Sequence, residues 1–168
     1  MIEISQLETE EDLEKVNQLN WEYLEWCVAQ AHDTVGEQLD INKYYQNSLD
    51  DQAAFLTETG RLLLAKEDGE IGGIICLKKI RDKVCEVKRL YVRPSFRGKK
   101  IGKRLIFRLI EEARAIGYSK ILLDADPYMS SAHNLYKTMG FVETAPYAES
   151  EVEGDAYAQH MIYMELVL

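Results

Sequence analysis

The stretch that decides the fold is Val84–Leu105, which reads VCEVKRLYVRPSFRGKKIGKRL. A strand-like apolar segment, Val84–Val92, runs directly into a basic turn that carries Gly98 and Gly102, and a helical pattern begins at Ile101. Glycine has no Cβ, so backbone N–H groups at such positions can close on a bulky anion. The helix N-terminus adds unpaired N–H donors and about half a positive charge. The stretch therefore predicts a strand–turn–helix unit that binds a phosphate group.

Basic residues are concentrated around this turn in an otherwise acidic chain. The formal net charge is −9, yet thirteen of the 20 Lys and Arg residues lie between Lys78 and Arg108, together with only two of the 29 acids, Asp82 and Glu86. An acidic body argues against a protein that binds nucleic acid over its surface. It fits a compact polyanion, such as a nucleotide phosphate group, held at one basic strip. A solvated, charged helix face is the alternative.

The rest of the chain predicts a single α/β domain over residues 1–168, because it contains no repeat and no Pro/Gly/Ser-rich linker. Apolar spacing and turn residues predict its elements. They are, in order, a helix from a Thr9 cap to about Ala31, a helix at 41–56, strands at 62–66 and 71–79 around Asp68-Gly69, the strand at 84–92, a helix at 101–116 that ends at Gly117, a strand at 121–124, a helix at 132–139, and closing strands at 141–145 and 158–167. This order favours helices packed on a mixed sheet.

Several other classes of protein are disfavoured. The N-terminus is acidic where a signal peptide would be basic, and no apolar run is long enough for a membrane span. The three cysteines, Cys27, Cys76 and Cys85, are unpaired in spacing and indicate reduced thiols of a cytoplasmic protein. The three histidines show no metal-binding spacing, so we expect no metal site.

The basic turn differs from two common phosphate loops, because neither G-x-x-x-x-G-K-S/T nor G-x-G-x-x-G is present. It resembles instead the pyrophosphate loop of the GNAT N-acetyltransferase superfamily, R/Q-x-x-G-x-G/A, read from Arg97 to Gly102 with Lys100 in place of the first glycine. Downstream, Ala132–Phe141 resembles the family's A-x-x-L-Y-x-x-x-G-F helix, although Met129 stands where many members carry Asn.

This resemblance implies a GNAT-like fold, with a mixed, mostly antiparallel sheet flanked by helices, and acetyl-CoA as cosubstrate. It also implies which residues hold the cosubstrate. These are Leu90, Tyr91, Val92, Arg97, Gly98, Lys99, Lys100, Ile101, Gly102, Lys103 and Asn134.

Acetyl transfer from a thioester to an amine needs a base for the amine proton, donors for the developing oxyanion and an acid for the leaving sulfur. Tyr136 matches the family's tyrosine that protonates the sulfur. Glu86 is the candidate base, direct or through water, because it is one of only two acids in the basic strip and lies on the strand that feeds the turn. Its position eleven residues before Arg97 resembles that of the glutamate base in several family members. An ion pair with Lys88 or Arg89 is the alternative. The resemblance also implies backbone donors from a bulge near Leu90–Val92.

Other polar and aromatic groups fit structural roles. We interpret Asp124 and Asp126 mainly as strand termination, with a position facing the acceptor as the alternative, and the acids from Glu149 to Asp155 as a solvated loop. Trp21, Tyr23 and Trp26 are interpreted as packing residues, with a place along the acceptor side as the alternative.

We expect a small-molecule amine as acceptor, cationic rather than acidic because the body is acidic, and a monomer or homodimer with no nucleic-acid or membrane partner. Three alternatives remain open: acetylation of a protein lysine or N-terminus, a non-catalytic coenzyme A sensor, and an RNA-binding module.

Overall fold

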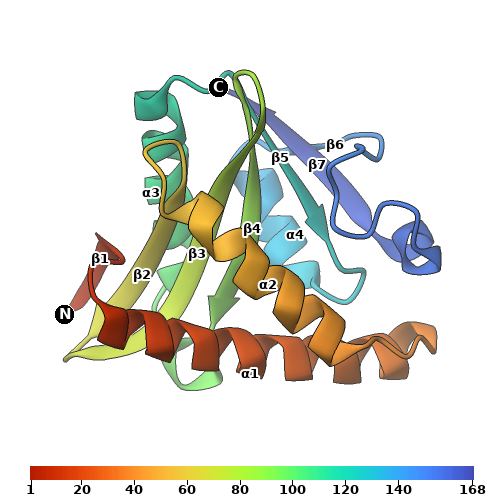
Figure 1. Ribbon diagram of the computed structural model, residues 1–168, viewed down its shortest axis with the longest axis horizontal. Coiled ribbons are helices and arrows are strands. Elements are labelled where there is room, and N and C mark those ends of the chain that lie inside the picture. The colour runs from red at the N-terminus through yellow and green to blue at the C-terminus, as the bar shows by residue number, and fades with distance from the viewer.

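The computed structural model describes residues 1–168 as one seven-stranded sheet with helices on both faces (Figure 1). The strands lie in the order β1-β2-β3-β4-β5-β7-β6, and only the β4–β5 pair is parallel. The elements are β1 (Ile2–Gln6), α1 (Glu10–Val35), α2 (Ile41–Phe55), β2 (Arg61–Glu67), β3 (Glu70–Arg81), β4 (Val84–Val92), the 3₁₀ helix η1 (Pro94–Phe96), α3 (Ile101–Ile116), β5 (Lys120–Ala125), α4 (Ser130–Thr138), β6 (Val142–Glu143), the 3₁₀ helix η2 (Ala156–His160) and β7 (Ile162–Val167). The expected mixed, mostly antiparallel sheet is confirmed.

The two faces of the sheet bury separate apolar cores. α1 and α2 cover one face, where Leu19 and Phe55 pack on Ile74, and α3 and α4 cover the other, where Leu105 and Tyr136 belong to the larger core (Figure 1). The apolar side chains of β3 and β4 are shared between these two cores. The central strands are therefore buried on both sides, which holds β4 rigidly beneath the helices.

The expected helix boundaries are largely confirmed. The Thr9 side chain accepts a hydrogen bond from the Asp12 N–H, which caps α1. α1 runs four residues beyond the expected end and stops at Gly36, whose left-handed backbone (φ 73°) closes the helix. Gly117 ends α3 in the same conformation, with φ 101°.

Three expectations about strands are wrong or incomplete. The sequence does not predict β1, because this strand has only five residues and is only half-buried. The strand expected at 141–145 is only Val142–Glu143. The strand expected from 158 begins at Ile162, because the Asp155 carboxylate accepts the Tyr157 N–H and caps η2 in its place.

None of the helices combines the length and the apolar composition that crossing a lipid bilayer requires.

Candidate active site

The basic turn between β4 and α3 presents a row of free backbone donors. None of the N–H groups from Gly98 to Lys103 donates to a protein acceptor, and the first helical bond of α3 runs from the Arg104 N–H to the Lys100 carbonyl. Gly98 has a positive φ of 81°, which directs this part of the turn without steric cost. Consecutive free N–H groups at a helix N-terminus form an anion-binding site.

The basic side chains of the turn divide into engaged and free groups. Arg97 donates from Nε to the Val92 carbonyl at 3.1 Å, and Lys99 pairs with Glu67 and lies over the Phe96 ring. The side chains of Lys100 and Lys103 are exposed and make no hydrogen bond or ion pair within the chain. These two lysines are therefore the cations that remain available to an anion at the row of free N–H groups.

Ile101 and Gly102 offer the turn only their backbone groups. Ile101 is buried in the larger core. A Cβ added to Gly102 would lie 3.5 Å from the Leu135 side chain and 4.0 Å from the Val92 side chain, which is ordinary contact.

Lys100 has the left-handed backbone that glycine would adopt freely, with φ 58°. In a residue with a side chain, such a conformation lowers the stability of the fold by about 1–2 kcal/mol. Replacement by glycine removes this strain but lowers stability by about 0.5–1 kcal/mol, because glycine loses more conformational entropy on folding. We expect Lys100→Gly to raise the free energy of urea-induced unfolding by about 0.5 kcal/mol. It should weaken binding of a polyanion severalfold, because it removes a free cation.

Lys83 provides the matched control, because it also has a positive φ (54°) but lies in the distant β3–β4 turn. Lys83→Gly should give the same gain in stability with no change in anion affinity. If both variants bind the anion equally well, Lys100 does not contribute to the site.

β4 carries a bulge just before the turn. The register of β4 against β3 shifts between Ile74 and Cys76, and at the shift Arg89 and Leu90 lie opposite a single residue of β3. Arg89 has a left-handed backbone, with φ 57°. The bulge that the resemblance implied near Leu90–Val92 therefore begins one residue earlier, at Arg89.

The edge of β4 that faces β5 becomes free after Glu86, three residues before the bulge. The parallel pairing of β4 with β5 ends at Glu86 and Leu122, whereas β5 continues along β7 to Ala125. The two strands separate from that point, and Figure 1 shows them diverging with α4 behind the space between them. A free strand edge can accept an extended ligand as an added strand.

A cleft of about 830 Å³, its mouth included, opens where β4 and β5 separate. Most of its wall is apolar, and it is built from α1, α2, β4, the end of β5, α4 and the segment 151–161. The lining residues are Tyr23, Leu24, Cys27, Val28, Leu39, Tyr44, Val87, Lys88, Arg89, Leu90, Asp124, Ala125, Asp126, Met129, Tyr136, Glu151, Val152, Tyr157 and Met161. A mostly apolar cleft with a few convergent polar groups is the usual form of a small-molecule site.

Tyr136 is brought to this cleft by α4. Its ring packs against Phe141 with the centroids 5.6 Å apart, and its hydroxyl makes no hydrogen bond within the protein. That oxygen is not among the polar atoms sealed from solvent, so it is accessible from the cleft. Burial, and to a smaller extent Asp124, raises the pKa of Tyr136, which keeps the hydroxyl protonated at neutral pH.

The other residues expected to hold the cosubstrate are not all at the cleft. Leu90 lines it, whereas the Tyr91 ring packs on Tyr23 at 5.4 Å on the α1 face of the sheet. Val92 is partly buried against the larger core, and Asn134 is exposed on α4. The contribution of Tyr91 and Val92 to a ligand is therefore limited to their backbones.

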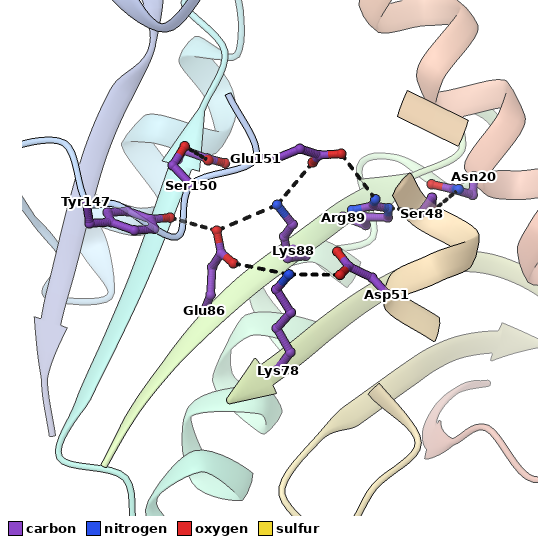
Figure 2. Close-up of polar contacts among 11 residues, drawn as sticks. Asn20, Ser48, Asp51, Lys78, Glu86, Lys88, Arg89, Tyr147, Ser150 and Glu151 are labelled. Carbon is purple, nitrogen blue, oxygen red and sulfur yellow. Dashed lines mark hydrogen bonds and ion pairs between the residues drawn. The ribbon is translucent and has the colours of Figure 1, made fainter. Parts of the chain in front are cut away.

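Glu86 does not line the cleft, because its side chain is fully buried. Figure 2 shows its carboxylate between Tyr147, Lys88 and Lys78. Its carboxylate accepts a hydrogen bond from the Tyr147 hydroxyl at 2.9 Å and lies 3.6 Å from Lys88 Nζ and 3.9 Å from Lys78 Nζ. Burial raises the pKa of Glu86, while the two lysines and the Tyr147 hydroxyl oppose that rise. The ion pair with Lys88 is thus present, but in the interior rather than on a strand surface.

The segment 147–155, here called the strap, holds the charged floor of the cleft together. The Glu151 carboxylate lies 3.0 Å from Lys88 Nζ and 3.7 Å from Arg89 Nη2 (Figure 2). Burial alone would raise the pKa of Glu151, but the two cations hold it below its usual range. The interpretation of the whole segment as a solvated loop was therefore wrong for Glu151.

Two further carboxylates, Asp124 and Asp126, line the cleft in addition to ending a strand. Asp124 accepts a hydrogen bond from Ser150 Oγ at 2.6 Å, and Asp126 accepts one from the Tyr157 hydroxyl at 2.7 Å. Burial raises the pKa of Asp126. The D-x-D spacing at the end of a strand beside a parallel neighbour is the signal that indicates such a position. Tyr23 likewise lines the cleft in addition to packing.

No group of three or more His, Cys, Asp or Glu side chains in the chain is arranged to hold a metal ion.

The chain was compared with known proteins. Residues 13–141 match the model of the Acetyltransferase (GNAT) family. An uncharacterized N-acetyltransferase of Schizosaccharomyces pombe is 30% identical over 163 residues, which covers 93% of this chain and 92% of that protein. An uncharacterized N-acetyltransferase of Dictyostelium discoideum is 46% identical over 65 residues, but the match spans 39% of this chain and only 30% of the relative.

Solved structures share the fold over the full length. A GNAT-family acetyltransferase of Staphylococcus aureus superposes with a TM-score of 0.76 at 19% identity, covering 100% of this chain and 99% of that one. The yncA acetyltransferase of Salmonella typhimurium, solved with acetyl-CoA, superposes with a TM-score of 0.68 at 19% identity, covering 100% and 94%. The turn of free backbone N–H groups, the bulged strand and the family match agree, and this chain belongs to the GNAT family of acetyltransferases, which take the acetyl group from acetyl-CoA.

Proposed function

We propose that this protein transfers the acetyl group of acetyl-CoA to the primary amine of a small molecule. The observation that supports the proposal is the cleft itself, because Tyr136 and the bulge residues Arg89 and Leu90 all line it. α2, the strap and η2 contribute Tyr44, Glu151 and Tyr157 to its wall. A protein lysine or N-terminus would favour a flat, open groove instead, so the walls support a small acceptor.

The donor side of the site follows from the turn. The pyrophosphate of acetyl-CoA would accept hydrogen bonds from the N–H groups between Gly98 and Lys103, with Lys100 and Lys103 as countercharges. The pantetheine arm would then run along the free edge of β4 towards the cleft. Both features fit acetyl-CoA because the anion site and the free strand edge are consecutive in the chain.

In the proposed reaction the neutral amine attacks the thioester carbonyl carbon, so a C–N bond forms and the C–S bond breaks. Backbone donors at the bulge would stabilise the oxyanion of the tetrahedral intermediate. The sulfur leaves as a thiolate and takes the proton of the Tyr136 hydroxyl. The amine gives up its proton to a carboxylate of the cleft, directly or through water.

The geometry of the cleft favours a different base from Glu86. Glu86 is sealed behind the floor of the cleft, which supports a role in orienting Lys88 and Tyr147 more than direct contact with an amine. Asp124 and Asp126 line the cleft, and each is partly exposed. We therefore favour these two residues as proton acceptors. Burial raises the pKa of Asp126, which favours it as the proton acceptor.

The charges of the cleft support a cationic acceptor over an acidic one. Lys88 and Arg89 are both tied to Glu151, and their side chains are only 3% and 7% exposed. An incoming carboxylate would therefore find no free cation, whereas a second ammonium group would find Asp124 and Asp126.

A panel of amines tests this function. The protein is incubated with acetyl-CoA and a polyamine, an aminoglycoside, an acidic amino acid or a lysine peptide, and release of free thiol is measured. We expect amine-dependent thiol release with a cationic small molecule, and a product heavier by one acetyl group. If no amine accelerates thiol release although acetyl-CoA binds, the protein is a coenzyme A sensor. If the peptide is the best acceptor, the small-molecule assignment is wrong.

A further inference from the structure

The backbone of Arg89 is strained at the point where the site needs an irregular strand. Its φ of 57° lies in the left-handed region, which residues with a Cβ seldom adopt. Such strain persists only where the surroundings over-determine the conformation, and it tends to mark functional positions. Here the strained residue is the first of the two residues that form the bulge.

The Arg89 side chain is clamped between two separate parts of the chain. Its Nε donates to Ser48 Oγ of α2 at 2.7 Å, and its Nη2 lies 3.7 Å from Glu151 of the strap (Figure 2). Ser48 is itself fixed, because its hydroxyl also accepts a hydrogen bond from Asn20 of α1. Both Ser48 and Asn20 are buried, so these anchors are shielded from competing water.

We propose that Arg89 is a positioning residue, whose clamped guanidinium holds its own backbone left-handed and thereby maintains the bulge that presents the β4 backbone to the thioester. The inference rests on the proposed acetyl transfer for its functional readout, but the bulge itself is observed independently of activity. A regular strand would pair the residues at 89 and 90 with β3 and remove the irregular backbone from the cleft wall.

Replacement of Arg89 by glycine and by alanine tests whether Arg89 acts by holding its backbone left-handed or by its positive charge. Both variants lose the clamp, but glycine adopts the left-handed conformation freely while alanine pays the full strain. We expect kcat of Arg89→Gly to exceed that of Arg89→Ala by roughly tenfold, with both below the parent. The KM for acetyl-CoA should stay within about threefold, because the phosphate turn is unchanged. Arg89→Lys, which keeps the charge but not the forked geometry, should not restore kcat.

Two control variants accompany these. Lys83→Gly relieves a similar left-handed conformation (φ 54°) far from the cleft and should leave kcat unchanged. Ser48→Ala removes one anchor without touching β4 and should lower kcat in the same sense as Arg89→Ala, by a smaller factor. It also covers the case in which Arg89→Ala does not fold, which thermal unfolding will show.

Crystal structures of the parent and of the glycine and alanine variants give the second readout. We expect the bulge to persist in the parent and in Arg89→Gly and to be lost or shifted in Arg89→Ala. The proposal is overturned if Arg89→Ala keeps the bulge, or if glycine and alanine give equal kcat while lysine restores it. A parent that transfers no acetyl group would refute the proposed function, while the register of β4 in the three structures would still decide the role of Arg89.

Discussion

Replacement of Tyr136 by phenylalanine is expected to lower kcat about 10²-fold, which is the usual contribution of a positioned general acid. The ring of Tyr136 would keep its contact with Phe141 and its place in the core, so only the hydroxyl is lost. That hydroxyl has no protein partner whose loss could disturb the fold. The KM for acetyl-CoA should therefore change little. Steady-state kinetics with the best amine of the panel provides the measurement.

Tyr45→Phe is the matched control, because Tyr45 lies on α2 against Trp21 and does not line the cleft. This variant should keep the parental kcat. A Tyr136→Phe enzyme within about twofold of the parent would mean that Tyr136 serves packing and that the leaving sulfur is protonated by another group.

Replacement of Gly102 by glutamate is expected to abolish stabilisation by acetyl-CoA. The new carboxylate would lie in the first turn of α3 and compete with the pyrophosphate for the free N–H groups. The fold itself should survive, because an acidic side chain near a helix N-terminus is favourable by about 0.5 kcal/mol. In the parent, acetyl-CoA at one hundred times its Kd should stabilise the fold by about 2.7 kcal/mol, or roughly 5–10 °C in Tm.

Gly102→Ala is the control for bulk alone. Its Cβ would meet Leu135 and Val92 at ordinary contact distances, so the variant should fold and retain most of the shift in Tm. If acetyl-CoA raises the Tm of Gly102→Glu as much as that of the parent, the phosphates bind elsewhere.

The turn and helix α3 could be predicted from sequence because their signals are local. Glycines, lysines and a helical apolar pattern fall within the stretch Val84–Leu105, and each reports on its own backbone. Tyr136 could be placed because the motif around it is equally compact. The left-handed backbone of Lys100 also explains why the family pattern carries glycine there, although lysine does not reveal it.

The floor of the cleft could not be predicted in this way, because its contacts join distant parts of the chain. Glu151 meets Lys88 across 63 positions, and the Tyr147 hydroxyl meets Glu86 across 61. From the sequence, the run of acids in the strap predicts a solvated surface loop. Only the packing of the strap on β4 shows that Glu151 neutralises two buried cations and that Glu86 is sealed from the cleft.

The position of the bulge could not be predicted from the sequence either. The bulge turns Val87 and Tyr91, which are four residues apart, towards opposite cores. β4 is buried on both faces, so its apolar pattern does not mark this shift, and the side-chain clamp comes from α1, α2 and the strap. Resemblance implied a bulge nearby, but its position and its support are properties of tertiary structure.

A crystal structure of the protein with acetyl-CoA tests the central claim most directly. We expect the pyrophosphate to accept hydrogen bonds from N–H groups between Gly98 and Lys103, the pantetheine arm to follow the free edge of β4, and the thioester sulfur to lie within hydrogen-bond distance of the Tyr136 hydroxyl. Phosphates bound away from this turn, or a thioester directed away from Tyr136 and the cleft, would contradict the account.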